Sequence, residues 1–194
     1  MKKPVKGYIM STARRANMKK ITPFLFVLLL IPIFLICSCT PAPVVIIEPK
    51  YSYEPNGIGL YLKADPRLNF YQGYPHTIRF CLYQLIDPMD FNQLKDKKEG
   101  LEKLCEGSSF GKVTTLKCFF LNPGHELRET LDRAEGTKWV GLIACYYKLQ
   151  ESKVIRVYEI PVKEEKVDKK TTQRKPGKLD INLYLGPEEI QELR

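Results

Sequence analysis

The chain has 194 residues, hydrophobic residues at 44% of its positions and a formal net charge of +9. This length suits one domain with a buried core. Residues 1–38 hold seven Lys or Arg and no Asp or Glu, so the chain from residue 39 onward carries only +2. Most of the basicity therefore belongs to a targeting segment, and the remainder lacks the charge pattern of a nucleic-acid-binding protein.

Residues 1–38 predict a signal peptide. Lys19 and Lys20 stand before an apolar run of thirteen residues, 24–36. This is the length of a secretory apolar region, whereas a membrane-spanning helix needs about 20 residues. The residues before Met18 show no core-forming pattern, and Met18 with its two following lysines is a better signal-peptide start. We therefore expect translation to begin at Met18.

A lipoprotein cleavage box ends this segment. It consists of an aliphatic Ile36, a tolerated Cys37, a small Ser38 and then Cys39. Cys37 is a poorer candidate for modification, because the bulky Ile36 would precede it directly. The pattern predicts that the Cys39 thiol takes a diacylglyceryl group and that its freed amine takes an acyl chain. The alternative is an uncleaved signal anchor.

Residues 39–50 are predicted to form a lipidated tether, because Pro41 and Pro43 cannot donate to a regular strand ladder. In lipoproteins of Gram-negative bacteria an Asp after the cysteine usually retains the protein at the inner membrane. Thr40 stands at that position here. We therefore expect a lipid-anchored location at the outer membrane, facing the periplasm.

Residues 51–194 predict one mainly β domain. Alternating apolar residues, or apolar runs bounded by turns, indicate its strands. The expected strands are 57–64, 77–86, 113–121, a weaker one around 127–131, 138–148, 153–162 and 179–185. The architecture predicted from them is a two-sheet β-sandwich.

The segments between these strands are expected to differ in structure. Residues 87–106 predict a short helical insertion between the second and third strands, with Asp87 and Pro88 at its start. Residues 163–178 are rich in Lys, Glu and Asp and are expected to form an exposed, mobile charged loop. The stretch after Gly186 is expected to be a final helical turn.

The sequence contains no catalytic, phosphate-binding or metal-ligating motif. A lipid-anchored hydrolase would need His76 or His125 to meet a Cys, a Ser or an acid. The four cysteines of the domain allow two disulfides with three possible connectivities, or serve as small buried apolar residues. They are Cys81, Cys105, Cys118 and Cys145.

The order of features resembles the TssJ (VasD/Lip) lipoproteins of the type VI secretion system. These features follow the lipobox and the first strand, and no single one is decisive. They are a loop with Leu68-Asn69, the strand 82–85, a helical insert with Phe91 and Leu94, a Pro123-Gly124 turn and the strand 139–144. The chain departs from the family in its cysteines, in its charged segment after Val162, and in Phe70-Tyr71, where the family often has Pro with an acidic residue.

The resemblance implies a transthyretin-like β-sandwich on the outer membrane that binds the periplasmic C-terminal domain of TssM, the inner-membrane partner, in a complex with TssL. It also implies no enzyme activity, no catalytic or metal residue, no small-molecule substrate and no cofactor beyond the lipid. The family's partner-binding loop corresponds to residues 65–75. The candidate residues in it are Leu68, Asn69, Phe70, Tyr71 and Gln72.

The residues themselves agree with that loop, because Phe70, Tyr71 and Tyr74 concentrate aromatic side chains in a predicted exposed segment. One alternative is that some of them fold back to cover the end of the sandwich. A second alternative for the whole protein is a lipid-anchored periplasmic carrier or ligand-binding module, which would show a deep apolar pocket.

Overall fold

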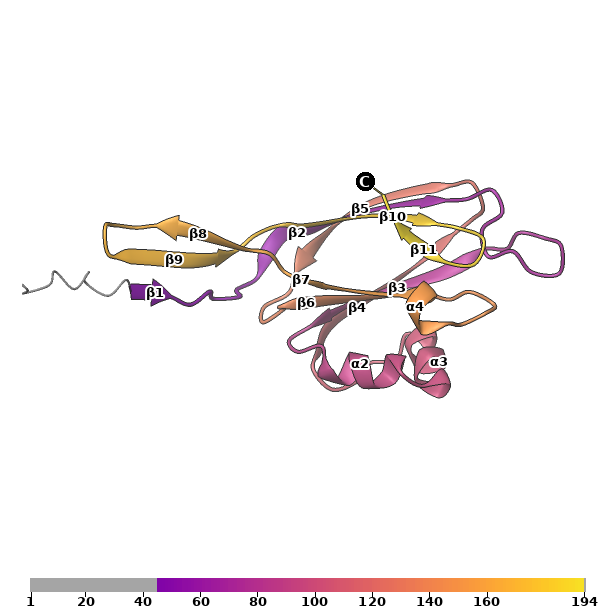
Figure 1. The fold of residues 1–194 in the computed structure, drawn as a ribbon, viewed down its shortest axis with the longest axis horizontal. Helices are drawn as coiled ribbons and strands as arrows, with labels where there is room; N and C mark the ends of the chain where they lie inside the picture. The colour runs from indigo at the N-terminus through magenta and orange to yellow at the C-terminus, as the bar shows by residue number, and fades with distance from the viewer. Residues whose placement is uncertain (1–44, 194) are drawn as a thin grey trace, which may run out of the picture. The chain divides into compact units, whose positions relative to one another are not determined.

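The computed structural model describes residues 45–193. Within them, two four-stranded sheets form a β-sandwich, a three-stranded sheet adjoins it, and three helices complete the fold (Figure 1). The predicted mainly β sandwich with a minor helical insertion is confirmed. The predicted signal peptide, the lipobox and the first tether residues lie outside the described residues. No helix in the described part of the chain is long and apolar enough to span a membrane.

The first sheet has the strand order β11-β10-β2-β5. Its central strand β2 runs parallel to β10 and antiparallel to β5. Alternate β2 side chains, those of Ile58, Leu60 and Leu62, are buried, as their spacing in the sequence predicted. The strands are β2 (Glu54–Ala64), β5 (Glu126–Arg133), β10 (Leu179–Leu185) and β11 (Ile190–Glu192).

The second sheet has the order β4-β3-β6-β7, with every neighbouring pair antiparallel. Its two central strands are apolar on both faces, and nearly all of their residues are buried. One face meets the first sheet and the other meets the helices, which explains why these strands lack a polar face. The strands are β3 (Ile78–Leu85), β4 (Val113–Leu121), β6 (Trp139–Ala144) and β7 (Ile155–Glu159).

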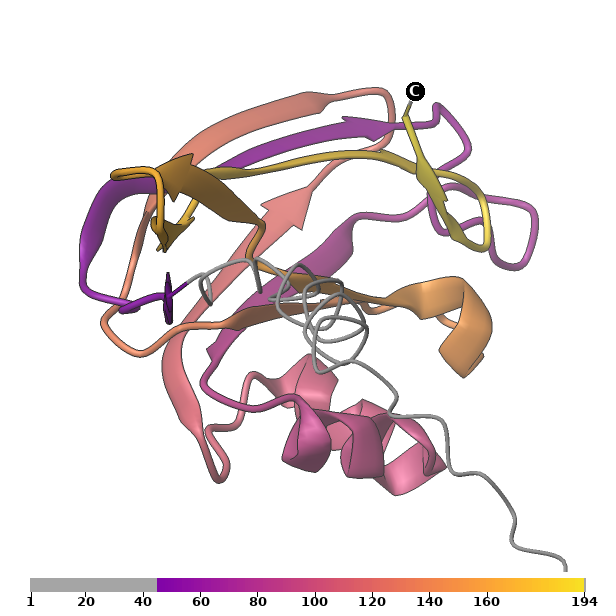
Figure 2. The same cartoon turned by 60° about the vertical axis from the view of Figure 1, so that its left-hand side comes forward.

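The helical insertion consists of α2 (Met89–Lys95) and α3 (Lys98–Glu106), which cover the outer face of the second sheet (Figure 2). Phe91 of α2 packs directly over Gly141 of β6, where an added Cβ would lie 2.7 Å from the Phe91 ring. The Tyr83 hydroxyl donates a 2.6 Å hydrogen bond to the Leu104 carbonyl oxygen, and burial raises the pKa of Tyr83 to about 12. The molecule therefore has a third, helical layer.

Two disulfides are present in this part of the molecule. One links two strands of the second sheet, and the other links the helical layer to that sheet. Cys81 of β3 is bonded to Cys118 of β4, with their Cα atoms 4.1 Å apart. Cys105 of α3 is bonded to Cys145, which follows β6, with a Cα separation of 5.6 Å. Of the three connectivities that the sequence allowed, the structure has this one. Each bond closes a chain loop of moderate length and contributes roughly 2–4 kcal/mol to stability.

The loop expected at 163–178 is wrong as secondary structure, because these residues form a hairpin of β8 (Val162–Lys166) and β9 (Thr171–Pro176), although β8 is exposed as expected. β1 (Val45–Ile47) of the expected free tether pairs with β9 in parallel, and the sheet order is β1-β9-β8. Opposite charges across the hairpin replace the missing apolar pattern. Glu164 pairs with Arg174 at 2.9 Å, and Glu165 pairs with Lys175 at 2.6 Å. We call this three-stranded sheet the charged blade.

The expected helical turn near the C-terminus is also wrong. Gly186 donates its backbone N–H to the Glu189 carbonyl oxygen at 2.8 Å, and this tight turn sends the chain back along β10 as β11. The spacing of Ile190 and Leu193 suits a helix, but Ile190 is only 1% exposed and fills the core from a strand. Burial of one side chain thus overrides a weak helical pattern.

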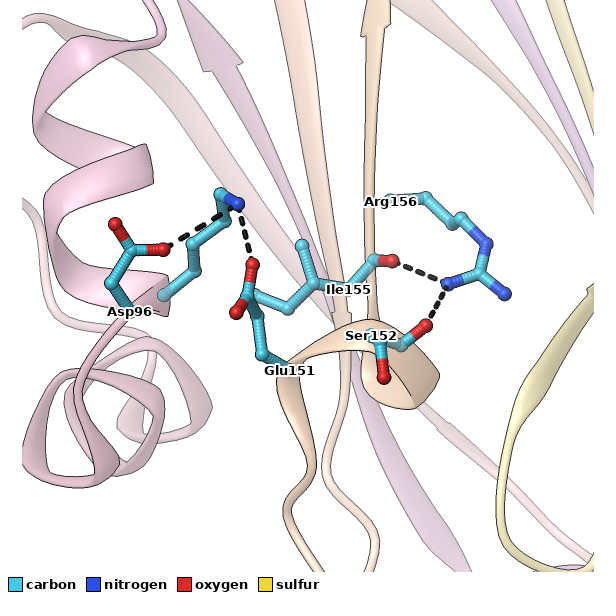
Figure 3. A network of polar contacts seen from close by, with 6 residues as sticks. Asp96, Glu151, Ser152, Ile155 and Arg156 are labelled. Carbon is cyan, nitrogen blue, oxygen red and sulfur yellow. Dashed lines mark hydrogen bonds and ion pairs between the residues drawn. The ribbon is translucent and has the colours of Figure 1, made fainter.

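A short helix that the sequence did not suggest, α4 (Glu151–Val154), links the layers at one edge. Lys95 at the end of α2 forms ion pairs with Asp96 at 3.5 Å and with Glu151 of α4. Arg156 of β7 donates to the carbonyl oxygens of Ser152 at 3.1 Å and of Ile155 at 2.6 Å (Figure 3). These contacts hold α4 between the helical layer and β7.

Candidate functional site

The loop between β2 and β3, residues 65–77, is fixed to the end of the sandwich by hydrogen bonds. Asp65 donates its backbone N–H to the Leu185 carbonyl oxygen at 2.9 Å. The Asp65 carbonyl oxygen accepts from the N–H groups of Leu68 at 2.9 Å and of Gly124 at 3.1 Å. The base of the loop is therefore joined to the end of β10 and to the turn between β4 and β5.

Leu68 and Asn69, two of the candidate partner-binding residues, are buried. Leu68 is 0% exposed and Asn69 is 4% exposed. The Asn69 carboxamide oxygen accepts the backbone N–H of Tyr147 at 2.8 Å, and its nitrogen donates to the Thr77 carbonyl oxygen at 3.4 Å. The expectation that both side chains face a partner does not fit this burial, because they instead fix the position of the loop.

The next residues form an exposed tip. Tyr71 and Tyr74 exchange two backbone hydrogen bonds of 2.9 and 3.0 Å, which closes a tight turn. Gln72 and Gly73 occupy this turn with φ angles of +49° and +86°. Phe70 is anchored through its N–H to the Pro187 carbonyl oxygen at 2.9 Å, yet its side chain is exposed. The tip therefore presents aromatic side chains on a constrained backbone.

Tyr147, which follows β6, completes this surface from a second segment of the chain. Its ring stacks on that of Tyr71, with centroids 4.6 Å apart and an interplanar angle of 15°. His76 approaches the same ring edge-on at 4.8 Å. Tyr147 is 57% exposed and Tyr74 is 71% exposed. We call the exposed side chains of Phe70, Tyr71, Tyr74 and Tyr147 the aromatic end surface.

Reasoning from the sequence missed Tyr147, although a signal for it was present. Tyr146 and Tyr147 are adjacent aromatic residues just after the end of β6. Tyr146 points inward, is 4% exposed and donates its hydroxyl to the Glu189 carbonyl oxygen at 2.9 Å. Tyr147, in contrast, is exposed, and its ring lies beside the loop tip because it stacks on Tyr71.

The carboxylate of Asp65 accepts hydrogen bonds at the base of the 65–77 loop. The hydroxyl of Tyr184 and the backbone N–H of Arg67 donate to Asp65, and these hydrogen bonds hold the pKa of its carboxyl below the ordinary value. The charged form is thus favoured in the folded state. The ionised Asp65 carboxylate therefore stabilises the fold at pH values above the ordinary pKa near 4. This stabilisation is lost as the pH falls through the lower pKa that Asp65 has in the folded state.

Replacing Asp65 by Asn should therefore lower the free energy of unfolding by about 1–3 kcal/mol at neutral pH. The variant should also lose less stability than the parent between neutral pH and about pH 3. Urea unfolding at the two pH values measures both effects. Asp180→Asn is the matched control, because Asp180 is 60% exposed and pairs with Lys178 on the surface. An equal loss of stability in both variants would contradict this role of Asp65.

The two histidines do not meet catalytic partners. His76 lies with its Nδ1 atom 3.3 Å from the Asn69 carbonyl oxygen, and its ring contacts Tyr147. His125 lies in the exposed turn after β4. The cysteines at 81, 105, 118 and 145 are bonded in disulfides, so none of these four is a free nucleophile. Residues 45–193 hold no cluster of three or more His, Cys, Asp or Glu arranged for a metal.

An open groove of about 430 Å³ lies elsewhere, between the edge strands β4 and β5, with Leu82 and Leu131 among its lining residues. Its central polar side chain, Gln84, is already satisfied. The Gln84 carboxamide donates to the Asp132 carbonyl oxygen at 2.8 Å and accepts the Ala134 N–H at 2.8 Å. The Gln84 side chain is therefore not free to orient a ligand in this groove.

The described part of the chain is thus a disulfide-bonded β-sandwich with aromatic side chains exposed at one end. The chain belongs to the family of type VI secretion lipoproteins described as VasD, EvfM, TssJ and VC_A0113, whose model matches residues 56–185. A search of curated proteins found no match.

Solved structures with the same fold come from this secretion system. The type VI lipoprotein TssJ1 of Pseudomonas aeruginosa matches with a TM-score of 0.51 and 22% identity, over 75% of this chain and 96% of its own. Serratia marcescens Lip, a membrane-bound component of the system, matches at 0.52 and 18%, over 74% and 98%. A chain of the structure described as the TssM C-terminal domain from EAEC matches at 0.52 and 16%, over 71% and 97%.

Proposed function

We propose that this chain is an outer-membrane lipoprotein of the type VI secretion membrane complex that anchors the periplasmic domain of TssM. The observation that carries the proposal is the aromatic end surface on the 65–77 loop. Family membership supports the secretion system as its setting, and the EAEC structure described by its TssM domain supports TssM as the partner.

The chemistry of this surface suits a protein partner. Tyr and Phe supply large contact areas with few rotatable bonds, and they are frequent anchors at the centres of interfaces. The loop is ordered before binding by Asp65, by Asn69 and by the closed turn between Tyr71 and Tyr74. Little conformational entropy is then lost on association, so more of the contact energy appears as affinity.

The mechanism is tethering without turnover. The lipid on Cys39 holds one end of the protein in the outer membrane, because several acyl chains on one residue contribute about 0.8 kcal/mol for each buried methylene. The domain then holds a partner that spans the inner membrane. This role needs no catalytic residue, no metal, no small-molecule substrate and no cofactor apart from the covalent lipid.

The experiment that tests the proposal is co-purification from solubilised membranes with the full lipoprotein as bait. The parent should recover a large inner-membrane protein identifiable as TssM by mass spectrometry. Changing Phe70, Tyr71 and Tyr74 together to Ala should abolish recovery, because the aromatic contact area is removed. The control is the double change of Tyr53 and Phe120, two exposed aromatics outside the aromatic end surface. Failure of the folded parent to recover any such protein would overturn the proposal.

The groove between β4 and β5 favours one alternative, a lipid-anchored carrier of an apolar ligand. Its volume of about 430 Å³ lies within the range of small-molecule sites. If the protein is a carrier, a small apolar molecule should co-purify with it from membranes in a stoichiometric amount. Mass spectrometry of an organic extract would detect that molecule. A protein recovered without such a molecule, and bound to TssM, would exclude the carrier.

A further inference from the structure

The charged blade concentrates positive charge at one end of a nearly balanced domain. Residues 162–178 hold seven Lys or Arg and three Asp or Glu, a net charge of +4. The remaining residues from 39 onward sum to −2. A sheet that projects from the sandwich and carries this excess creates a local positive potential, which attracts anionic surfaces.

The excess lies at the tip of the blade. The charges near its base are neutralised by the ion pairs of Arg174 with Glu164 and of Lys175 with Glu165. In contrast, Lys166, Lys169 and Lys170 are exposed and form no ion pair with another described residue. The turn itself is fixed by the Lys170 N–H, which donates to the Asp168 carboxylate at 2.7 Å. The tip therefore presents exposed ammonium groups on a hydrogen-bonded turn.

The tip is also where the described chain begins. Val45 donates its backbone N–H to the Lys170 carbonyl oxygen at 2.8 Å. From there β1 runs parallel to β9, from the tip toward the sandwich (Figure 1). Val45 is six residues after Cys39 in the chain. Fully extended, this stretch reaches about 20 Å. If Cys39 carries the lipid, as the proposed function requires, the tip lies close to the membrane surface.

Exposed apolar side chains accompany the lysines. Val45 is 57% exposed, Ile46 is 49% exposed and Ile47 is 44% exposed, although all three sit in a paired strand. Val167 in the turn is 58% exposed. Apolar side chains beside basic ones suit the boundary between lipid headgroups and acyl chains, where each kind finds a favourable environment.

We propose that the charged blade lies on the anionic phospholipid headgroups of the leaflet that holds the lipid of Cys39. Lys166, Lys169 and Lys170 contact the phosphates, and Val45 and Val167 enter the interface beside them. The inference rests on the proposed lipid anchor but goes beyond it. The protein then has two attachments to one membrane, and the blade sets the direction in which the sandwich points away from it.

The test uses the mature lipoprotein inserted through its own lipid into vesicles of phosphatidylethanolamine, with or without phosphatidylglycerol. Hydrogen–deuterium exchange of peptides from 162–176 should slow only on the vesicles that contain phosphatidylglycerol. High salt should remove this protection, because it screens the contact. Lys169→Glu with Lys170→Glu should weaken the contact at least about twentyfold and abolish the protection, since each basic residue near such a surface contributes about fivefold.

The matched control is Lys97→Glu with Lys98→Glu, an equal charge change at exposed positions where α3 begins, outside the blade. It should leave the protection intact. Unchanged exchange on all vesicles, equal protection on vesicles without phosphatidylglycerol, or protection that appears without vesicles through self-association would each overturn the blade contact. Vesicle flotation separates the two proposals: a parent protein that fails to float refutes the anchor, whereas one that floats with an unprotected blade refutes the blade contact alone.

Discussion

Tyr71→Ala should weaken binding of the lipoprotein to the periplasmic domain of TssM by about thirtyfold or more, the loss typical of a central aromatic anchor. The reason is that Tyr71 occupies the tip of the 65–77 loop and stacks on Tyr147, with ring centroids 4.6 Å apart. Isothermal titration of the purified TssM domain against the lipoprotein in detergent measures the change.

Tyr147→Ala should also weaken binding, and the double variant should lose less than the sum of the two single losses. Stacked residues that act together are coupled, so the second change removes a contact already impaired. Tyr53→Ala is the matched control, because Tyr53 is 55% exposed but lies outside the aromatic end surface. Additive losses from Tyr71 and Tyr147 would contradict a shared binding surface.

Leu68→Ala provides a contrast within the same loop. Leu68 is fully buried, so truncating it should lower the free energy of unfolding by about 2–5 kcal/mol. Any loss of binding by that variant should then follow the loss of stability, whereas Tyr71→Ala should bind weakly while keeping its stability. This comparison separates residues that position the loop from residues that contact the partner.

Cys39→Ser should leave the domain folded and abolish type VI secretion. Serine cannot form the thioether that carries the diacylglyceryl group, so the outer end of the tether is lost and TssM is no longer held at that membrane. The described domain begins after this position and holds its own core and disulfides, which is why its fold should survive. A secretion assay in cells and mass spectrometry of the protein provide the measurements.

Cys37→Ser is the control for that prediction. It alters the neighbouring cysteine in the lipobox but keeps Cys39 available, so lipidation and secretion should both continue. Normal secretion by Cys39→Ser would remove the anchoring role, and loss of lipid from Cys37→Ser would assign the modification to the other cysteine. The two variants together therefore test which cysteine carries the lipid and whether secretion requires that lipid.

Most of the sandwich could be predicted, because burial on one face imposes a period of two on the sequence. Ile58, Leu60 and Leu62 show this pattern in β2, and the continuous apolar run in β6 correctly indicated a strand covered on both faces. The helical insertion could be located from a different signal. Asp87 and Pro88 are residue types that are favoured at helix starts.

The charged blade could not be predicted from those patterns. Its strands bury little, so no apolar period marks them, and pairing depends on matches such as Glu165 with Lys175 between segments that a turn brings together. The strand at Ile190 escaped notice because three residues carry no period, and only its contact with β10 defines it. Both the charged blade and β11 form through pairing with strands that the local sequence pattern does not indicate.

The exposure of the 65–77 loop could be predicted from the sequence only in part. The aromatics of 70–74 correctly marked an exposed tip. Leu68 and Asn69 were assigned to the same surface because they lie in the segment that corresponds to the family's partner-binding loop. Their burial depends on the ends of β6 and β10, which the local sequence does not describe. Tyr147 joins the surface through the same tertiary arrangement.

The direction of β2 has a mechanical consequence. From the blade, the chain runs through β1, through residues 48–53 and then through the eleven residues of β2 to the 65–77 loop at the other end of the sandwich (Figure 1). Tension between a lipid at Cys39 and a partner on that loop is thus carried by a strand that already rises about 3.3 Å per residue, close to the limit of the backbone. Such a strand gains almost no length when pulled. Force does little work on it, and the second sheet, the helices and the two disulfides remain outside the loaded strand.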